Sequence, residues 1–305
     1  MSALAIDVKG LRKTYGRLEA VRGIDLSVSP GEVFAMLGPN GAGKTTTVEI
    51  LEGHRIRTAG EVSVLGFDPA RGGSAFRQRI GIVLQTVGVE HYLTVAEAID
   101  LFRGYYPSPR ALDDVIEVVG LTEKRNTRVK KLSGGQQRRL DVAIGLAGDP
   151  DLLFLDEPTT GFDPGARRNA WKMIENLKSL GKTVFLTTHY MDEAQNLADR
   201  VAIIMGGEIV AEGTPSTLAA REGNLTRIAF RLPADSPDLP AALGASVGSD
   251  GLVHLETADP TRTLYGLTGW ALSTEVELIH LSVSRPSLED VYLQLTQTPE
   301  GGPSE

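Results

Sequence analysis

A glycine-rich segment between two apolar stretches constrains the fold of this chain more than any other feature. It reads Gly38-Pro39-Asn40-Gly41-Ala42-Gly43-Lys44-Thr45 and matches the phosphate-binding pattern G-x-x-x-x-G-K-[ST]. The residues before it, 33–37, form an apolar run typical of a strand buried on both faces, and residues 44–52 have helical spacing. Such a loop needs this context, because its amide groups must converge on phosphate oxygens where a helix begins. The sequence therefore predicts a P-loop in an α/β fold.

The residue types in this loop suit a nucleoside triphosphate. Lys44 is expected to reach the β- and γ-phosphates, and the Thr45 hydroxyl is expected to ligate Mg²⁺. Glycines adopt backbone angles closed to other residues, so successive N–H groups can point at the phosphates. The alternative is a glycine-rich turn with an unrelated lysine, which the flanking strand and helix disfavour. The candidate ATP-binding residues are Gly38, Pro39, Asn40, Gly41, Ala42, Gly43, Lys44, Thr45 and Thr46.

Short apolar segments alternate with helical ones along the first 220 residues, a pattern that favours a parallel α/β sheet. Helical patterning dominates from Thr94 to about Ala147 and interrupts this alternation, so it predicts a helical subdomain of about residues 86–150. The expected helices outside it cover residues 44–52, 166–180 and 191–198. The expected strands cover residues 4–9, 18–28, 33–37, 61–65, 80–84, 152–155 and 184–188, followed by a hairpin of 201–205 and 208–212.

A change in composition marks a second domain. From Arg221 onward the chain holds five Arg, no Lys and twelve Asp plus Glu, a charge of −7, whereas the first 220 residues sum to about −1. Residues 225–295 return to short alternating segments, which predict a small, mostly-β α+β domain that ends in a helix at 287–295. We therefore expect a nucleotide-binding domain at 1–220, an accessory domain at 221–297 and a disordered tail at 298–305.

The overall composition disfavours several classes of function. A net charge of −8 argues against nucleic acid as the main partner, since phosphate backbones favour clustered Lys and Arg. The chain has no cysteine, which rules out disulfides, thiol catalysis and Cys-based zinc sites. No apolar run approaches the roughly 20 residues that span a bilayer, and we expect no signal peptide. Work at a membrane is therefore expected to depend on a separate membrane protein.

Further motifs follow the P-loop in a fixed order. Residues 132–136, Leu-Ser-Gly-Gly-Gln, stand at the start of a helical pattern and resemble the signature motif of ABC ATPases. Residues 153–158 resemble the Walker B strand with its adjoining glutamate. Residues 161–164 resemble the D-loop, with Phe162 where leucine is commoner. The remaining matches are Gln85 to the Q-loop, His189 to the H-loop and Tyr15 to the adenine-stacking aromatic, so that the motifs cover about residues 4–220.

The set as a whole resembles the ATP-binding subunits of ABC-2-type exporters, including the drug-resistance group related to daunorubicin exporters. Residues 286–292, Pro-Ser-Leu-Glu-Asp-Val-Tyr, resemble the end of that group's C-terminal extension. The resemblance implies a P-loop NTPase fold of the ABC ATPase type, with a RecA-like core and an inserted helical subdomain. It also implies an ATPase, with ATP and Mg²⁺ as cofactors, that powers export of a drug, lipid or other small molecule.

The resemblance implies a role for each catalytic candidate. Asp156 would hold Mg²⁺ through water, Glu157 would be the general base for the attacking water, and His189 would contact the γ-phosphate. Gln85 would touch Mg²⁺ or the attacking water, and Tyr15 would stack on adenine. Simpler interpretations are a capping or solvated acid for Glu157 and a packing aromatic for Tyr15. The candidate catalytic residues are Lys44, Gln85, Glu157 and His189, and the candidate metal ligands are Thr45, Gln85 and Asp156.

The signature motif also implies an assembly. Ser133, Gly134, Gly135 and Gln136 have no evident role within their own subunit. In the family they close over the nucleotide bound by another subunit, where a helix N-terminus adds positive potential. The expectation is a head-to-tail dimer with two shared ATP sites and Asp163 at the seam. The dimer would bind an integral membrane permease on a separate chain, as a peripheral protein at the cytoplasmic face of the cell membrane.

Two other classes of function remain to be weighed. One is a soluble ABC ATPase that acts on ribosomes or DNA, which the acidic balance and the single ATPase half disfavour. The other is a nucleotide-binding partner that does not hydrolyse ATP. The joint presence of Lys44, Asp156, Glu157 and His189 argues against this second class. The transported substrate is chosen by the membrane subunit, so this sequence does not identify it.

Overall fold

The computed structural model describes residues 4–83, 88–219, 225–233, 236–240, 243–247, 252–284 and 288–297. These residues form two compact units, which divide between Pro215 and Ser216. The change in charge near residue 220 therefore lies close to a structural boundary. The candidate residue Gln85, the segment 285–287 and the expected tail 298–305 lie outside the described residues. In the described part of the chain, no helix is both long and apolar enough to cross a membrane.

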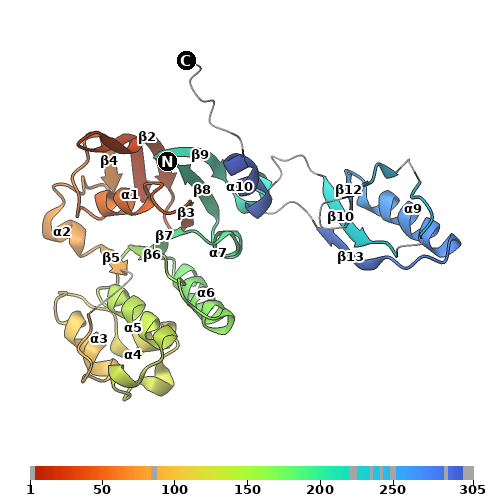
Figure 1. Ribbon diagram of the computed structural model, residues 1–305. Helices are drawn as coiled ribbons and strands as arrows, with labels where there is room; N and C mark the ends of the chain where they lie inside the picture. The colour runs from red at the N-terminus through yellow and green to blue at the C-terminus, as the bar shows by residue number, and fades with distance from the viewer. Residues whose placement is uncertain are drawn as a thin grey trace. The chain divides into compact units, whose positions relative to one another are not determined.

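A six-stranded sheet forms the centre of the first unit (Figure 1). Its first five strands are parallel, and β9 runs antiparallel to β8. The two middle strands, β7 and β3, are buried along their whole length, which agrees with the continuous apolar sequence of β3 and the apolar centre of β7. Phe34 of β3 stacks on Phe185 of β7, with ring centroids 5.4 Å apart. In spatial order the strands are β5 (Ile80–Val83), β6 (Leu152–Asp156), β7 (Thr183–Thr188), β3 (Val33–Leu37), β8 (Arg200–Met205) and β9 (Glu208–Gly213).

A smaller antiparallel sheet shares its hydrophobic core with the central one. It consists of β2 (Leu18–Val28), β1 (Ile6–Tyr15) and β4 (Ala59–Val64), in that order. Apolar residues of these strands pack in one cluster with residues of β3, β6 and β7 and with helix α1 (Lys44–Leu51). Because α1 is packed within this cluster, the loop that precedes it is held at both ends.

A group of helices is inserted between β5 and β6. It contains α3 (Val95–Arg103), α4 (Leu112–Val118) and α5 (Gly134–Leu146), and Figure 1 shows the three gathered beyond β5 and β6. Thr94 and Glu97 form a capping box at the start of α3, in which each side chain bonds the other residue's backbone N–H. These helices agree with the helical patterning expected for residues 94–147.

Two helices follow the strands that carry candidate residues. α6 (Pro164–Ser179) follows β6, and its buried positions 170, 173, 174 and 177 have the spacing of one helical face. α7 (Met191–Leu197) follows β7. Arg167 of α6 donates a 2.9 Å hydrogen bond to Asp192 of α7, which ties the two helices together. The shorter helices α2 (Gly73–Arg77) and α8 (Pro215–Ala219) and the 3₁₀ helices η1 (Thr122–Lys124) and η2 (Val129–Lys131) complete the described elements before residue 220.

The second unit contains a four-stranded antiparallel sheet and a helix that the sequence did not predict. The helix, α9 (Pro260–Ser273), begins at Asp259, whose side chain accepts a 3.1 Å bond from the N–H of Arg262. Leu267 of α9 packs on Ile228 and Phe230 in the core of this unit. The last strand of this sheet begins at Ile279. The elements are β11 (Ser246–Val247), β12 (Val253–Thr257), β10 (Thr226–Arg231) and β13 (Ile279–Ser284), in spatial order, with α9 and the closing helix α10 (Leu288–Gln297).

Candidate active site

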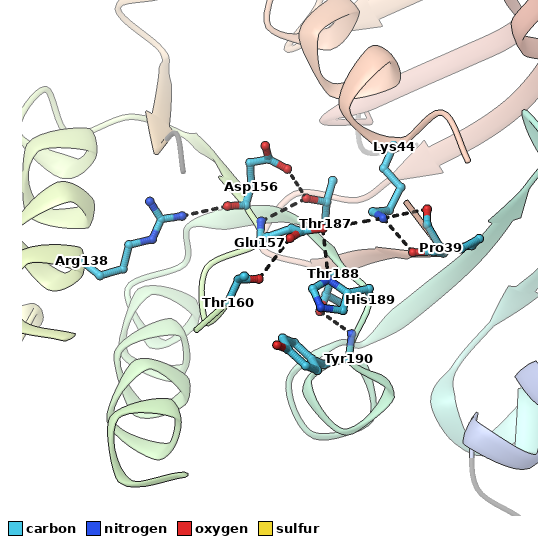
Figure 2. A network of polar contacts seen from close by, with 11 residues as sticks. Pro39, Lys44, Arg138, Asp156, Glu157, Thr160, Thr187, Thr188, His189 and Tyr190 are labelled. Atoms are coloured by element: carbon cyan, nitrogen blue, oxygen red, sulfur yellow. Dashed lines mark hydrogen bonds and ion pairs between the residues drawn. The ribbon is translucent and has the colours of Figure 1, made fainter. Parts of the chain in front are cut away.

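Three loops meet at the carboxyl ends of neighbouring strands in the central sheet. The P-loop follows β3, the loop with Glu157 follows β6, and the loop with His189 follows β7. Because β6, β7 and β3 are adjacent and parallel, these loops leave the same edge of the sheet. Figure 2 shows side chains from the three loops directed toward one another. The fold therefore brings Lys44, Glu157 and His189 together from distant parts of the sequence.

The glycines of the P-loop lie where no side chain fits. A Cβ atom on Gly38 would come within 2.3 Å of the Ile204 carbonyl oxygen, and one on Gly43 within 2.6 Å of the Ala20 carbonyl oxygen. Gly43 is also the N-cap of α1 and has a φ of 106°, in the region that favours glycine. Within α1, no side chain caps the N-terminus and the first turn holds no acidic residue. This end of the helix therefore suits an anionic ligand.

The ammonium group of Lys44 is buried inside this loop. Its Nζ donates to the carbonyl oxygens of Gly38 at 2.7 Å and Pro39 at 3.1 Å, and it lies 3.8 Å from Oε1 of Glu157 (Figure 2). Burial lowers the pKa of Lys44, although the negative charges of Glu157 and Asp156 act in the opposite direction. A buried cation that is bonded mainly to neutral carbonyls fits a triphosphate ligand, which supplies the missing negative charge.

Glu157 has an unusual backbone conformation for a residue with a side chain. Its φ of 45° lies in the left-handed region, which costs of order 1 kcal/mol or more for a non-glycine residue. The backbone N–H of Glu157 donates to both the carbonyl oxygen and the Oγ1 of Thr187, each at 3.1 Å, and these bonds hold the conformation. Strain that the surrounding structure maintains in this way is typical of functional sites.

The carboxylate of Glu157 is nearly buried and faces three polar side chains. Oε1 lies 3.2 Å from Nδ1 of His189, and Oε2 accepts a 3.1 Å hydrogen bond from Thr160 (Figure 2). The contact with His189 has an ion-pair distance but not the alignment of a hydrogen bond. Burial raises the pKa of Glu157, but His189, Thr160 and Lys44 together outweigh it, so the net shift is downward. The carboxyl group is therefore ionised at neutral pH, as a proton acceptor must be.

Asp156 ends β6 and is held by a residue that the sequence did not single out. Its Oδ1 accepts a 2.5 Å hydrogen bond from Oγ1 of Thr187, the hydroxyl that also accepts the Glu157 N–H. Within the described ranges, no group of three or more His, Cys, Asp or Glu side chains is arranged to hold a metal ion. The oxygen atoms of Asp156 and of the exposed Thr45 are of the type that Mg²⁺ prefers, and phosphate oxygens and water would complete its shell.

The signature motif has a role inside its own subunit, contrary to expectation. Ser133 is the N-cap of α5, and its Oγ accepts a 3.4 Å bond from the N–H of Gln136. In return the Gln136 side chain accepts a 3.0 Å bond from the N–H of Ser133. This is a capping box, which satisfies amide groups that the first turn of a helix leaves without partners. The spacing Ser-x-x-Gln is the sequence pattern of a capping box, but the same residues were interpreted only as the signature motif.

Asp163 likewise caps its own helix. Its Oδ1 accepts hydrogen bonds from the N–H groups of Gly165 at 2.8 Å and Ala166 at 2.9 Å, at the start of α6. These backbone bonds lower the pKa of Asp163.

Tyr15, at the end of β1, is 38% exposed and lies below the cationic groups of Lys13 and Arg55, 4.9 and 5.3 Å from its ring centroid. The ring is therefore partly exposed, with two cations near its face.

Arg138 of α5 connects the signature helix to the end of β6, and sequence reasoning did not identify it. The side chain is buried, and it donates to the carbonyl oxygens of Asp156 at 2.8 Å and Pro158 at 3.4 Å (Figure 2).

A cavity of about 650 Å³ lies beside the contact between Arg138 and the end of β6. Its lining includes residues 133–135 and Glu157 and none of residues 38–45. This cavity therefore borders the N-terminus of α5 and Glu157 without reaching the P-loop of the same chain.

Comparison with known proteins identifies the family. A model described as "ABC transporter" matches residues 21–160, and a model described as "ABC transporter domain-containing protein-like, C-terminal domain" matches residues 226–287. The chain is 37% identical to a daunorubicin resistance ATP-binding protein of Streptomyces coeruleorubidus, with 97% of each chain covered. The chain belongs to the ABC transporter ATPases. It is also 38% identical to a Nod factor export ATP-binding protein I of Rhizobium sp. (strain N33), with 97% of this chain and 98% of that protein covered.

The fold agrees with solved ABC cassettes. The chain resembles a dimeric ATP-binding cassette in a post-hydrolysis state bound to ADP and Pi, with a TM-score of 0.60 and 25% identity. The match covers 68% of this chain and 98% of the cassette. The predicted ABC ATPase fold, with a second C-terminal domain, is therefore confirmed.

Proposed function

We propose that this chain is the ATP-hydrolysing subunit of an exporter and drives a drug, lipid or other small molecule through a separate membrane permease. The names of the two relatives support export, since one confers daunorubicin resistance and the other exports Nod factor. The observation that carries hydrolysis is the convergence of Lys44, Glu157 and His189 within 3.8 Å contacts at one edge of the sheet. A chain that only bound nucleotide would have no need of a strained, ionised glutamate beside its P-loop.

The residues divide the work of phosphoryl transfer to water. Residues 38–46 bind the phosphates through backbone N–H groups, and Lys44 exchanges its carbonyl contacts for β- and γ-phosphate oxygens. Glu157 accepts the proton of the attacking water. His189, 3.2 Å from that carboxylate, orients it and contacts the γ-phosphate. Tyr15 stacks on the adenine, and Gln85 contacts the attacking water or the metal.

Mg²⁺ would be held by the Thr45 hydroxyl, by Asp156 through water and by Gln85, and when bound it neutralises charge on the phosphates. Thr187 fixes the orientation of Asp156 through the 2.5 Å bond to Oδ1. The same hydroxyl accepts the Glu157 N–H, so the metal ligand and the general base share one support. This shared support keeps the two carboxylates in a constant relation to each other.

Two copies complete the site. The cavity that residues 133–135 line together with Glu157 has no P-loop residue of the same chain in its lining, which supports a head-to-tail dimer in which α5 of one copy faces the ATP of the other. The relative solved as a dimer with ADP and Pi also supports this arrangement. Asp163, at the start of α6, lies at the seam. The dimer binds the permease at the cytoplasmic face of the membrane, with no role for nucleic acid.

Substitution of the general base tests this proposal. Glu157→Gln keeps the shape of the side chain and removes its ability to take a proton, so the ATPase rate should fall by about 100-fold or more while ATP binding persists. Release of phosphate and the affinity for a fluorescent ATP analogue are measured on the purified full-length chain. Glu175→Gln, on the exposed face of α6, is the matched control and should behave like the unmodified protein. Retained turnover in a folded Glu157→Gln protein contradicts the assignment.

A further inference from the structure

A fully buried glutamate lies next to the active site without taking part in the proposed reaction. Glu193, on α7, has no exposed surface, and neither of its carboxylate oxygens has a well-aligned hydrogen bond. A carboxyl group in this environment costs several kcal/mol if it is ionised and unpaired. A buried carboxyl group of this kind is therefore expected either to be stabilised by neighbouring polar groups or to have a functional role.

The neighbours of Glu193 lie in the loop after β6, which carries Glu157, and at the end of β7, next to His189. Burial raises the pKa of Glu193, and the hydroxyl groups of Thr188 and Thr159 act in the opposite direction. Both threonines are fully buried, and Oγ1 of Thr159 has no other hydrogen-bond partner. The carboxyl group therefore faces one hydroxyl from the loop after β6 and one from Thr188, the last residue of β7.

Each of these hydroxyls is close in sequence to a proposed catalytic residue. Thr159 follows Glu157 and Pro158, and Thr188 immediately precedes His189. Thr188 also accepts a 3.0 Å bond from the N–H of Tyr190, which fixes the turn that carries His189 (Figure 2). A displacement of either threonine therefore moves the general base or the histidine.

Helix α5 also contributes a side chain near Glu193. The guanidinium of Arg138 in α5 is close enough to Glu193 for the two charges to interact, and it donates to the carbonyls of Asp156 and Pro158 at 2.8 and 3.4 Å. The buried cluster of Glu193, Thr159, Thr188 and Arg138 thus underlies the loop that carries Glu157. Its members come from α7, the loop after β6, the end of β7 and the signature helix.

We infer that Glu193 is a positioning residue for ATP hydrolysis, because its carboxyl group joins the Glu157 loop to the His189 loop through Thr159 and Thr188. The inference rests on the roles proposed above for Glu157 and His189. A residue that merely filled this space would be replaceable by any side chain of similar size. A positioning residue must instead keep its hydrogen-bonding capacity, since misplacement of reacting groups by about 1 Å costs up to about 100-fold in rate.

The test compares substitutions that separate volume from hydrogen bonding. Glu193→Met keeps the volume and removes both oxygens, and it also removes the cost of burying a carboxyl group that lacks a well-aligned hydrogen bond. We expect kcat of the full-length protein to fall between about 10-fold and about 100-fold, with KM for ATP changed less than about threefold. Glu193→Gln, which can still bond both hydroxyls, should restore kcat to within about threefold of the unmodified value.

Three further variants complete the series. Thr159→Val removes the hydroxyl from the other side of the contact and should reproduce the kcat loss, so the test does not depend on one variant folding. Asn196→Ala, on the exposed face of α7, is the control and should leave kcat unchanged. Glu157→Gln, measured in parallel, reports separately on the proposed base. If Glu157→Gln loses turnover while Glu193→Met and Thr159→Val keep normal kcat, or if Gln fails to restore what Met loses, the positioning role is wrong.

Discussion

The hydroxyl group of Thr187 makes two contacts that converge on the acidic pair after β6. It donates to Oδ1 of Asp156 at 2.5 Å and accepts the N–H of Glu157 at 3.1 Å. The second contact helps to hold Glu157 at its φ of 45°, which the residue would otherwise leave. A single buried hydroxyl therefore sets the orientation of one carboxylate and the backbone of the other.

Replacement of this hydroxyl should reduce both activity and stability. Thr187→Val keeps the branched shape but leaves a buried N–H and a carboxylate oxygen with fewer partners, which costs about 1–3 kcal/mol in the free energy of unfolding. We expect kcat for ATP to fall about tenfold or more, because the base and the metal ligand lose a common support. Urea unfolding and steady-state ATPase assays measure the two effects.

The control lies on the same strand. Thr183, at the other end of β7, is also buried, and its hydroxyl accepts a 3.0 Å bond from the N–H of Gly31. Thr183→Val should lower stability by a similar amount without changing kcat, since its contact is far from the catalytic loops along the strand. Equal loss of kcat in both variants would mean that Thr187 acts only through stability.

At the scale of secondary structure, α5 depends on a cap that its own sequence provides. Ser133 and Gln136 form the capping box described above, so Ser133→Ala should destabilise the protein by about 1 kcal/mol even where no second copy is present. Thr94→Ala removes the equivalent box at α3, away from the catalytic loops, and should cost about the same. Urea unfolding of both variants at low protein concentration is the measurement. If Ser133→Ala leaves stability unchanged there, the cap contributes nothing to the isolated subunit.

Local sequence patterns predicted the buried strands but not every helix. The buried strands 33–37, 152–156 and 183–188 were predictable, because each contains a short apolar run between glycine or polar residues, and such runs have few other outcomes. α9 was missed because Gly266 and Gly269 lower helix propensity in its interior, and its true start signal, Asp259 followed by Pro260, was not used. Packing of Leu267 in the core outweighs those glycines.

Some residues of the candidate site could be identified from the sequence, and others could be identified only from the structure. Lys44, Asp156, Glu157 and His189 could be named because each follows a predicted buried strand in a known order of motifs. Thr187 and Glu193 could not, since a threonine in a strand and a glutamate in the first turn of a helix are ordinary residues in sequence. Only their burial against the catalytic loops distinguishes them.

At the scale of the whole molecule, Gly134 offers a clean test of assembly. A Cβ atom built on Gly134 meets nothing within 4 Å of its own chain, so Gly134→Arg should fold normally and obstruct only a second copy. Glu157→Gln protein with ATP should form a dimer in solution, and the added Gly134→Arg change should abolish it, as measured by light scattering. Gly269→Arg, in equally open space on α9, is the control and should leave the dimer intact. Undiminished dimerisation of the Gly134→Arg protein contradicts the shared site.

The position of β3 in the central sheet has a consequence for biosynthesis. β3 pairs on one side with residues 184–188 and on the other with residues 200–203, although the phosphate-binding loop that follows it is complete by residue 45. Pairings between such distant segments form late, because the intervening chain must first be closed into a loop. A growing polypeptide that has left the ribosome only as far as the signature helix therefore has the loop's sequence but not its rigid frame. We therefore expect nucleotide recognition to begin only after β7 and β8 have emerged and paired with β3.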